Sequence, residues 1–234
     1  MIFAALCDAG VNNTFALIIS IALTVIVSYL LGSLNFGIIF SKLLYKEDVR
    51  SSGSGNAGST NMLRTYGKKA AIFTFLGDCA KTALAISLGL LLFLERGMFI
   101  AGLFCMIGHT YPVFFKFKGG KGVACFAILV LMTSIKMGIW YVFVLLFAMF
   151  VIIVIGTKFV SLGSVVCSLL YPIILNRIIH IFEDNPYQSI EIYAVVAALF
   201  VVFQHRTNIV RLFKGQENKI SLFKKKNKKG GESK

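Results

Sequence analysis

The stretch TFALIISIALTVIVSYLLGSLNFGIIF, residues 14–40, decides the fold class of this chain. Its 27 residues include no charged side chain, and about 20 consecutive apolar residues are enough to cross a bilayer as a helix. The stretch is also too long for the apolar region of a signal peptide, and no clear cleavage site follows it. We therefore expect a transmembrane helix that the mature protein retains.

Further apolar runs follow along the chain, at 70–94, 98–115, 122–135, 138–156, 159–180 and 191–205. The composition is 57% apolar and the mean hydropathy is +0.82, which is typical of a polytopic membrane protein. We expect an all-α membrane protein, a single polytopic bundle of about seven transmembrane helices. The runs at 98–115, 122–135 and 191–205 are short, so they either end early beside a wet cavity or are re-entrant.

Positive charge is concentrated in three segments that lie between or after the apolar runs. Of the 24 Lys and Arg residues, 19 lie within 42–69, 116–121 and 206–234. The positive-inside rule places these segments in the cytoplasm, with the N-terminus outside and the C-terminus inside. Five spans would satisfy the same rule if 98–135 formed a re-entrant hairpin. Topology thus explains the net charge of +14, and we expect no nucleic-acid partner.

The end of the chain has a different composition from the rest. We expect residues 1–219 to form the membrane domain and residues 220–234, with KKKNKK at 224–229, to form a disordered basic tail in the cytoplasm. In the simplest interpretation its lysines only set topology. Contact of this tail with anionic lipid headgroups is the alternative.

The first polar interruption is SSGSGNAGSTN at 51–61, followed by Arg64. Glycines leave backbone N–H groups free to turn toward an anion, and a nearby arginine adds charge, so such a loop can cradle a phosphate. Thr60 and Asn61, followed by Arg64, are typical of a helix N-terminal turn that binds an anion. A flexible linker would have similar glycine and serine content, but it would not explain the asparagines and the arginine.

The second interruption is GHTYPVFFKFKGGKG at 108–122. Three lysines surround a Gly-Gly pair that ends where a helix begins, which predicts a second phosphate site. The GxxxxGK[ST] spacing of nucleotide-binding loops is absent, so a nucleotide is not indicated. The alternative is a short turn between helices, whose lysines merely follow the positive-inside rule.

The third polar segment is HRTNIVRL at 205–212, with Glu217 beyond it. A histidine at a helix end serves either as an interface residue or in chemistry, and the neighbouring Arg and Asn keep both open. Asp78 and Lys81 lie one helical turn apart inside an apolar run, where either alone would cost a few kcal/mol. We expect them to form an ion pair, although a proton relay in a transporter would have the same sequence.

These three segments closely resemble the signature motifs of the bacterial acyl-phosphate:glycerol-3-phosphate acyltransferases, the PlsY family. The resemblance extends over about residues 20–219 and rests on the order, the spacing and the shared face of the motifs. The matching patterns are Gly53-Ser54-Gly55-Asn56-x-Gly58-x-Thr60-Asn61-x-x-Arg64, Gly108-His109-x-x-Pro112-x-Phe114-Phe115-x-Phe117-x-Gly119-Gly120-Lys121-Gly122, and His205-Arg206-x-Asn208-Ile209-x-Arg211-Leu212-x-x-Gly215-x-Glu217.

The resemblance implies the transfer of a fatty acyl group from acyl phosphate to the 1-hydroxyl of glycerol-3-phosphate. The products would be lysophosphatidic acid and phosphate, formed in phospholipid biosynthesis at the cytoplasmic face of a bacterial plasma membrane. No cofactor and no metal are implied, and the partners would be the two substrates and membrane lipid.

The resemblance also implies roles for individual residues. Arg64, Lys118 and Ser161 would hold the glycerol phosphate. His205 and Asn208 would orient the attacking hydroxyl, and together with Ser54 they would be the catalytic residues. The acyl phosphate would be held by Ser54, Thr60 and Asn61 and by the turn Gly119, Gly120, Lys121 and Gly122.

A membrane transporter or flippase for a phosphorylated solute is the alternative function. It would place charges near the bilayer midplane and often contains repeated halves. In this sequence no repeat is visible and the polar segments converge on one surface, with only Asp78 and Lys81 deep in the bundle. The acyltransferase interpretation is therefore preferred.

Overall fold

A computed structural model describes residues 12–181 and 191–220, and within these ranges the chain is helical with short loops. The tail predicted to be disordered lies, except for Ile220, outside the described residues. The elements are α2 (Asn13–Ser33), α3 (Phe36–Tyr45), the 3-10 helix η1 (Val49–Ser51), α4 (Ser59–Tyr66), α5 (Lys68–Thr110), the 3-10 helix η2 (Val113–Phe115), α6 (Val123–Lys136), α7 (Trp140–Thr157), α8 (Val160–Ile181), α9 (Glu191–Gln204) and α10 (Arg206–Phe213).

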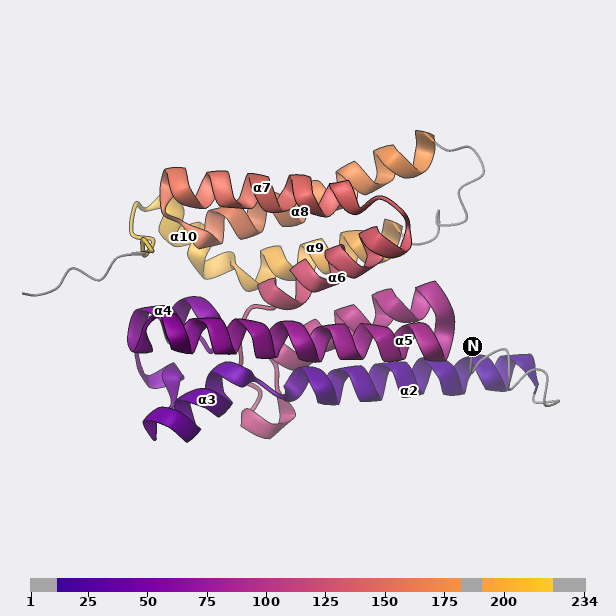
Figure 1. The fold of residues 1–234 in the computed structure, drawn as a ribbon, viewed down its shortest axis with the longest axis horizontal. Helices are drawn as coiled ribbons and strands as arrows, with labels where there is room; N and C mark the ends of the chain where they lie inside the picture. The colour runs from indigo at the N-terminus through magenta and orange to yellow at the C-terminus, as the bar shows by residue number, and fades with distance from the viewer. Residues whose placement is uncertain (1–11, 182–190, 221–234) are drawn as a thin grey trace, which may run out of the picture.

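The long helices lie side by side, and the short helices α3, α4 and α10 gather at one end of the bundle (Figure 1). Helix α5 is two helices that meet at a sharp break, where Phe93 and Leu94 leave helical geometry. Its two halves fold back on each other, and Gly89 and Gly97 pack so closely that a side chain at either would overlap the backbone of the other. The predicted runs at 70–94 and 98–115 are therefore the two arms of one hairpin.

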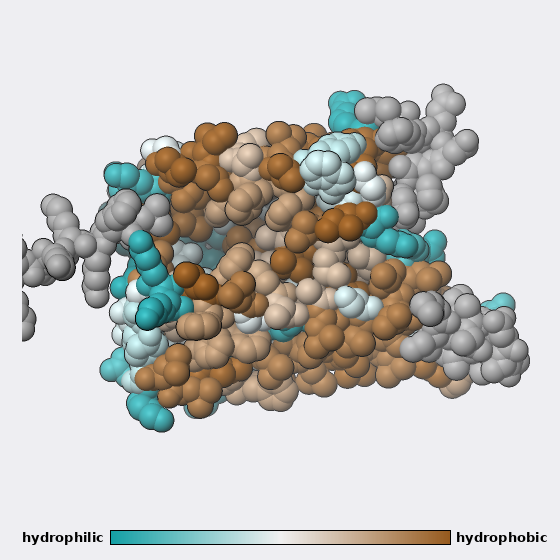
Figure 2. Space-filling view, viewed as in Figure 1, coloured by the Kyte–Doolittle hydropathy of each residue, from teal (hydrophilic) through white to brown (hydrophobic). Residues whose placement is uncertain are grey.

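The helices confirm a polytopic membrane protein. Within the described residues, four helical stretches are long and apolar enough to cross a bilayer, and the bent pair α9 and α10 would add a fifth. Large apolar side chains cover the flank of the bundle, as Figure 2 shows, and Ile152 and Ile155 of α7 are among the most exposed. Such a surface suits lipid rather than water.

Small side chains allow α2 to lie close against α5. Ser20, Thr24 and Ser28 are buried on one face of α2, and Gly32 continues this face where α2 meets the backbone of Cys105. Small residues at a membrane interface let helix backbones approach closely, which increases van der Waals contact. Packing along this face fixes where α2 ends, and therefore where the chain turns into α3 and the first polar loop that follows α3.

The break between α2 and α3 turns the chain toward the polar end of the bundle. Asn35 caps α3, because its side-chain oxygen accepts a hydrogen bond from the N–H of Ile38 at 3.2 Å. Helix α3 is followed by the first glycine-rich loop and then by α4, which begins just after Gly58. The loop and α4 therefore lie beside the second and third polar segments (Figure 1).

Candidate functional site

A cavity of about 660 Å³ opens where the polar loops meet. Residues from all three predicted motifs line it, together with the start of α8. The predicted site residues that line the cavity are Ser54, Thr60, Asn61, Arg64, Lys121, Gly122, Ser161, His205 and Asn208. The structure thus brings together residues that are up to about 150 positions apart in the chain, as expected if the segments share one membrane face.

Glu217 lies at the centre of the polar end of the cavity. Its Oε1 accepts hydrogen bonds from Ser161 Oγ at 2.9 Å and from Asn208 Nδ2 at 2.7 Å. Its Oε2 lies 3.0 Å from Nε of Arg211. One carboxylate therefore positions groups from α8 and α10. Sequence analysis placed Glu217 in the third motif but gave it no role, because a single acid after a basic segment resembles an ordinary surface residue.

Two cations complete this polar end. Lys121 donates a hydrogen bond to the side-chain oxygen of Asn208, and Arg64 Nη2 donates to the backbone oxygen of Asn218 at 3.0 Å. Burial is the largest cause that lowers the pKa of Lys121 to about 8; the nearby charge of Arg211 acts in the same direction, and Glu217 opposes the shift. Burial also lowers the pKa of Arg64. The cluster has more cations than acids in a desolvated place, which favours an anionic ligand.

The first loop is shaped by Asn61, which is buried. Its side-chain nitrogen donates to the backbone oxygens of Val49 and Ser52, each at 3.0 Å. Its side-chain oxygen accepts from the N–H of Ser54 at 2.8 Å. Gly53 has a φ of +63°, and a side chain there would overlap the Asn61 amide. Asn61 therefore holds the loop that presents Ser54 to the cavity.

The second loop differs from the expectation of a backbone cradle. The N–H of Gly119 donates to Thr110 O at 2.9 Å, and that of Gly120 donates to His109 O at 3.0 Å, so both are already used within the protein. Neither glycine lines the cavity, and neither does Lys118, whose side chain is exposed. Their predicted contact with substrate stays a prediction; in the structure they form the support for Lys121.

His205 lies at the bend between α9 and α10 and is buried beside the cavity. Its Nδ1 is 2.8 Å from the backbone oxygen of Val201. Because a carbonyl oxygen only accepts, Nδ1 carries the proton, and in the neutral ring Nε2 is the acceptor. The ring can thus accept a hydrogen bond from a hydroxyl group.

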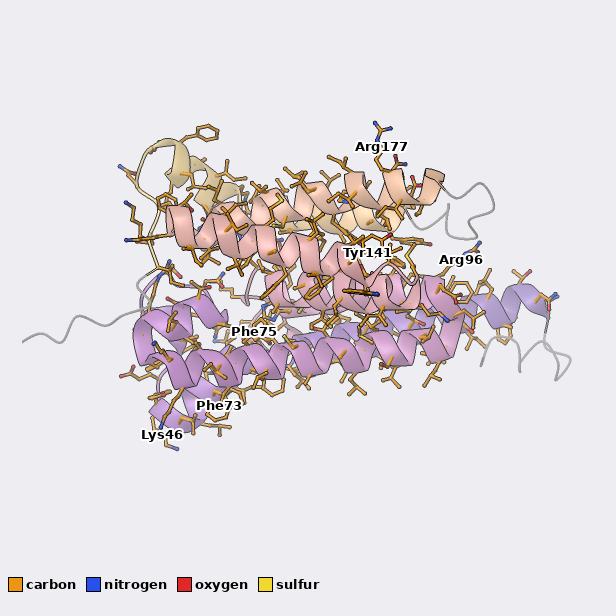
Figure 3. All side chains as sticks on the ribbon, turned by 45° about the horizontal axis from the view of Figure 1, so that its top comes forward. Lys46, Phe73, Phe75, Arg96, Tyr141 and Arg177 are labelled. Atoms are coloured by element: carbon orange, nitrogen blue, oxygen red, sulfur yellow. The ribbon has the colours of Figure 1, made fainter. Side chains whose placement is uncertain are left out.

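An apolar groove continues from the polar end between α6, α7 and α8. Phe126, Val130 and Leu146 are among its lining residues. Phe75 of α5, labelled in Figure 3, and Phe147 of α7 also line the cavity, yet they are 45% and 54% exposed on the apolar flank. The cavity therefore opens sideways toward lipid as well as at the polar end.

A basic, water-accessible pocket joined to an apolar groove that opens to lipid defines a class of integral membrane enzymes that act on phosphorylated lipid headgroups and acyl chains. The comparisons with known proteins identify the family. The family model described as glycerol-3-phosphate acyltransferase matches residues 22–215. The chain belongs to the glycerol-3-phosphate acyltransferase family, and it is an acyltransferase of the PlsY type.

Individual relatives support the same assignment. The glycerol-3-phosphate acyltransferase of Carboxydothermus hydrogenoformans is 40% identical over 204 residues, which are 87% of this chain and 98% of that protein. The enzyme of Coxiella burnetii is 36% identical, over 86% of this chain and 98% of that protein.

Two crystal structures of PlsY, an integral membrane glycerol 3-phosphate acyltransferase, also match. The glycerol 3-phosphate form has a TM-score of 0.76 and 33% identity, and covers 86% of this chain and 96% of that one. The lysophosphatidic acid form has a TM-score of 0.74 and 32% identity, and covers 87% of this chain and 96% of that one.

Proposed function

We propose that this acyltransferase uses acyl phosphate as donor and forms lysophosphatidic acid and phosphate. The 1-hydroxyl oxygen of glycerol-3-phosphate bonds to the acyl carbonyl carbon, the bond from that carbon to the phosphate oxygen breaks, and the hydroxyl proton ends on the departing phosphate. The observation that carries this proposal is the joining of a basic pocket to an apolar groove in one cavity. The lysophosphatidic acid form of PlsY supports it.

The family resemblance implied Lys118 for the phosphate of glycerol-3-phosphate and Lys121 for the acyl phosphate. Because Lys121 lines the cavity and Lys118 does not, we instead assign the glycerol phosphate to Arg64, Lys121 and Ser161. All three line the cavity. The pKa of both cations is lowered mainly by burial, as expected where charges wait in a desolvated pocket. A phosphate dianion between them would form charge-assisted hydrogen bonds, which are about twice as strong as neutral ones.

His205 and Asn208 are assigned to the attacking hydroxyl. Nε2 of His205 is the acceptor of the neutral ring, and Asn208 is held by Lys121 and Glu217 on its two side-chain atoms. Alignment of the reactants and hydrogen bonds to the developing oxyanion supply the acceleration in this scheme. A strong protein base is unnecessary because the phosphate oxygens can take the proton.

The acyl phosphate is assigned to the first loop and the apolar groove. Ser54 and Thr60 line the polar part of the cavity near the start of α4, where backbone N–H groups favour an anion. The acyl chain would lie along α6 and α7, with Phe75 and Phe147 at the lipid side. Donor and product would then enter and leave within the bilayer.

We further propose seven spans, with the N-terminus outside and the cavity at the cytoplasmic face of a bacterial plasma membrane, in a membrane domain that covers residues 1–219. The arms of α5 on either side of Phe93 and Leu94 count as two spans, and α2, α6, α7, α8 and α9 supply the others. All polar loops of the site then lie on the side that the positive-inside rule assigns to the cytoplasm.

The test is a two-substrate assay on purified protein in lipid nanodiscs. Phosphate release from acyl phosphate should require glycerol-3-phosphate and should be matched by lysophosphatidic acid. Arg64→Ala should raise the KM for glycerol-3-phosphate, and Lys69→Ala, an exposed cation in the first turn of α5 outside the cavity lining, is the matched control. Phosphate release without glycerol-3-phosphate would refute the proposed reaction. Uptake of glycerol-3-phosphate into sealed vesicles without ester formation would favour a transporter.

A further inference from the structure

Asp78, Lys81 and His109 form a buried ionic cluster inside the bundle. Asp78 and Lys81 lie on the first arm of α5 and His109 lies near the end of the second arm. Lys81 Nζ is 2.9 Å from Asp78 Oδ1 and 3.0 Å from His109 Nδ1, and that same histidine nitrogen is 3.4 Å from Asp78 Oδ1. The predicted ion pair is confirmed, and a third group has joined it.

One carboxylate, that of Asp78, is enough to neutralise the buried charge of Lys81, yet Lys81 also contacts other groups. Its Nζ also donates to the backbone oxygens of Gly32 at 2.9 Å and Leu34 at 2.8 Å. These carbonyls lie at the end of α2, where the helix leaves carbonyl groups without a partner of its own. A cation at a helix C-terminus is favoured by the helix dipole. Lys81 therefore fixes the α2–α3 break to α5.

His109 carries the connection on to the second loop. Its backbone oxygen accepts hydrogen bonds from Gly120 N at 3.0 Å and from Asn35 Nδ2 at 3.3 Å. Its imidazole lies so close to Gly120 that any side chain at that position would overlap the ring. Lys121 follows directly in the chain and reaches Asn208 in the cavity.

The second loop in turn touches the first. Ala57 N donates to the backbone oxygen of Gly119 at 3.4 Å, and Ala57 is a buried residue of the first loop. A continuous set of contacts thus runs from Lys81 through His109 and Gly120 to both loops of the site. The backbone between Thr110 and Gly122 has only short helical structure of its own, η2, so its course depends on such contacts.

We propose that Asp78, Lys81 and His109 are positioning residues for the acyltransferase: a buried ionic clamp that sets the second loop so that Lys121 reaches the phosphate of glycerol-3-phosphate. The inference rests on the proposed assignment of Lys121 to that phosphate. Asp78 and His109 also line the cavity, and in this arrangement their role is to hold the loop and not to transfer a proton. The Nδ1 atom of His109 makes the contact with Lys81 and Asp78, and the ring shapes the position of Gly120.

Substitutions at His109 test the clamp. Asn places a polar atom where Nδ1 lies, whereas Leu fills similar space without one. We expect His109→Leu to raise the KM for glycerol-3-phosphate about tenfold, the effect of one misplaced charged hydrogen bond, while kcat changes less than about threefold. His109→Asn should recover most of that loss in KM. The readouts are KM, kcat and the melting temperature in nanodiscs.

One further variant separates the clamp from the phosphate assignment. Lys121→Met should raise the same KM; an unchanged KM there would overturn the phosphate assignment rather than the clamp. If Lys121→Met raises KM but His109→Leu does not, the clamp is refuted. A fall in kcat that is equal in His109→Asn and His109→Leu would also refute it, because the ring would then act chemically.

If the His109→Leu protein fails to fold, the double variant Asp78→Asn with Lys81→Met tests the clamp in its place. It removes both charges together and so leaves no lone buried ion. The clamp predicts a raised KM for glycerol-3-phosphate in this protein, and an unchanged KM would refute it. Cys79→Ser, beside Asp78 on the same arm of α5, is the matched control for a polar change at this depth.

Discussion

Replacing Glu217 tests whether one carboxylate organises the polar end of the cavity. Its side chain is only 4% exposed and binds Ser161, Asn208 and Arg211. Glu217→Gln keeps an oxygen that can accept from Ser161 and Asn208, but it turns the charged contact with Arg211 into two donors facing each other. Glu217→Ala removes all three contacts.

The expected loss of kcat/KM in Glu217→Gln and in Glu217→Ala can be estimated from the contacts that each variant removes. A hydrogen bond to a charged group contributes about 1.5–3 kcal/mol, and we take about 1.4 kcal/mol for Arg211 because its side chain is 35% exposed and water replaces part of the contact. Glu217→Gln should therefore lower kcat/KM about tenfold. The neutral hydrogen bonds that Gln keeps with Ser161 and Asn208 contribute about 1 kcal/mol each, and Ala loses these as well. Glu217→Ala should then lose about 3.4 kcal/mol, or roughly 300-fold.

The prediction also states how kcat and the KM for glycerol-3-phosphate should each change when Glu217 is replaced. Asn208 is assigned to the hydroxyl, so its release should lower kcat. At a pH well below 8, where Lys121 stays charged even though the loss of Glu217 lowers its pKa, the KM for glycerol-3-phosphate should stay level or fall, since the remaining cations lose a competing anion. Initial rates in nanodiscs at saturating acyl phosphate measure both constants. Gln216→Ala, an exposed neighbour, is the control. A tenfold rise in KM with kcat unchanged would refute this role of Glu217.

Two more predictions concern Lys121 and Gly120. Because burial lowers the pKa of Lys121 to about 8, its charge is lost as pH rises through that value, so kcat/KM for glycerol-3-phosphate should fall above about pH 8. Lys121→Arg should remove this fall, and a profile unaffected by it would contradict the assignment. Gly120→Ala would drive a methyl group into the imidazole of His109 and should destabilise the protein by about 2 kcal/mol. The melting temperature should therefore drop, whereas Gly156→Ala, with open space around it, should leave it unchanged; equal melting temperatures would show that the loop yields freely.

The sequence was sufficient to predict the helices and the turn after residue 94, but not the break between α2 and α3. Apolar runs fixed the helical bundle, because only a helix satisfies its own backbone within a bilayer. The α2–α3 break depends on Lys81 binding the carbonyls of Gly32 and Leu34, a contact between residues about 50 positions apart. No local pattern contains that information. The hairpin at Phe93 and Leu94 was visible only as the turn between two runs.

The site was predictable where residues reach the cavity through side chains. Arg64, Ser161 and Asn208, to which the family resemblance gives roles, line the cavity, and the roles themselves stay predictions. Gly119 and Gly120 were read as free N–H donors, yet tertiary contacts with Thr110 and His109 use both groups. A glycine pair in a sequence does not reveal whether it faces a ligand or another part of the protein, since both need a backbone without side chains.

The sideways opening between Phe75 and Phe147 determines which concentration of the acyl donor sets the reaction rate. A donor that arrives through this opening is dissolved in the membrane and not in the aqueous phase, so its effective concentration is a mole fraction of the membrane. Adding inert phospholipid at constant total volume should therefore slow the reaction, although no bulk concentration changes. Glycerol-3-phosphate, in contrast, follows ordinary solution kinetics. The same protein thus couples a two-dimensional supply of acyl chains to a three-dimensional supply of headgroups.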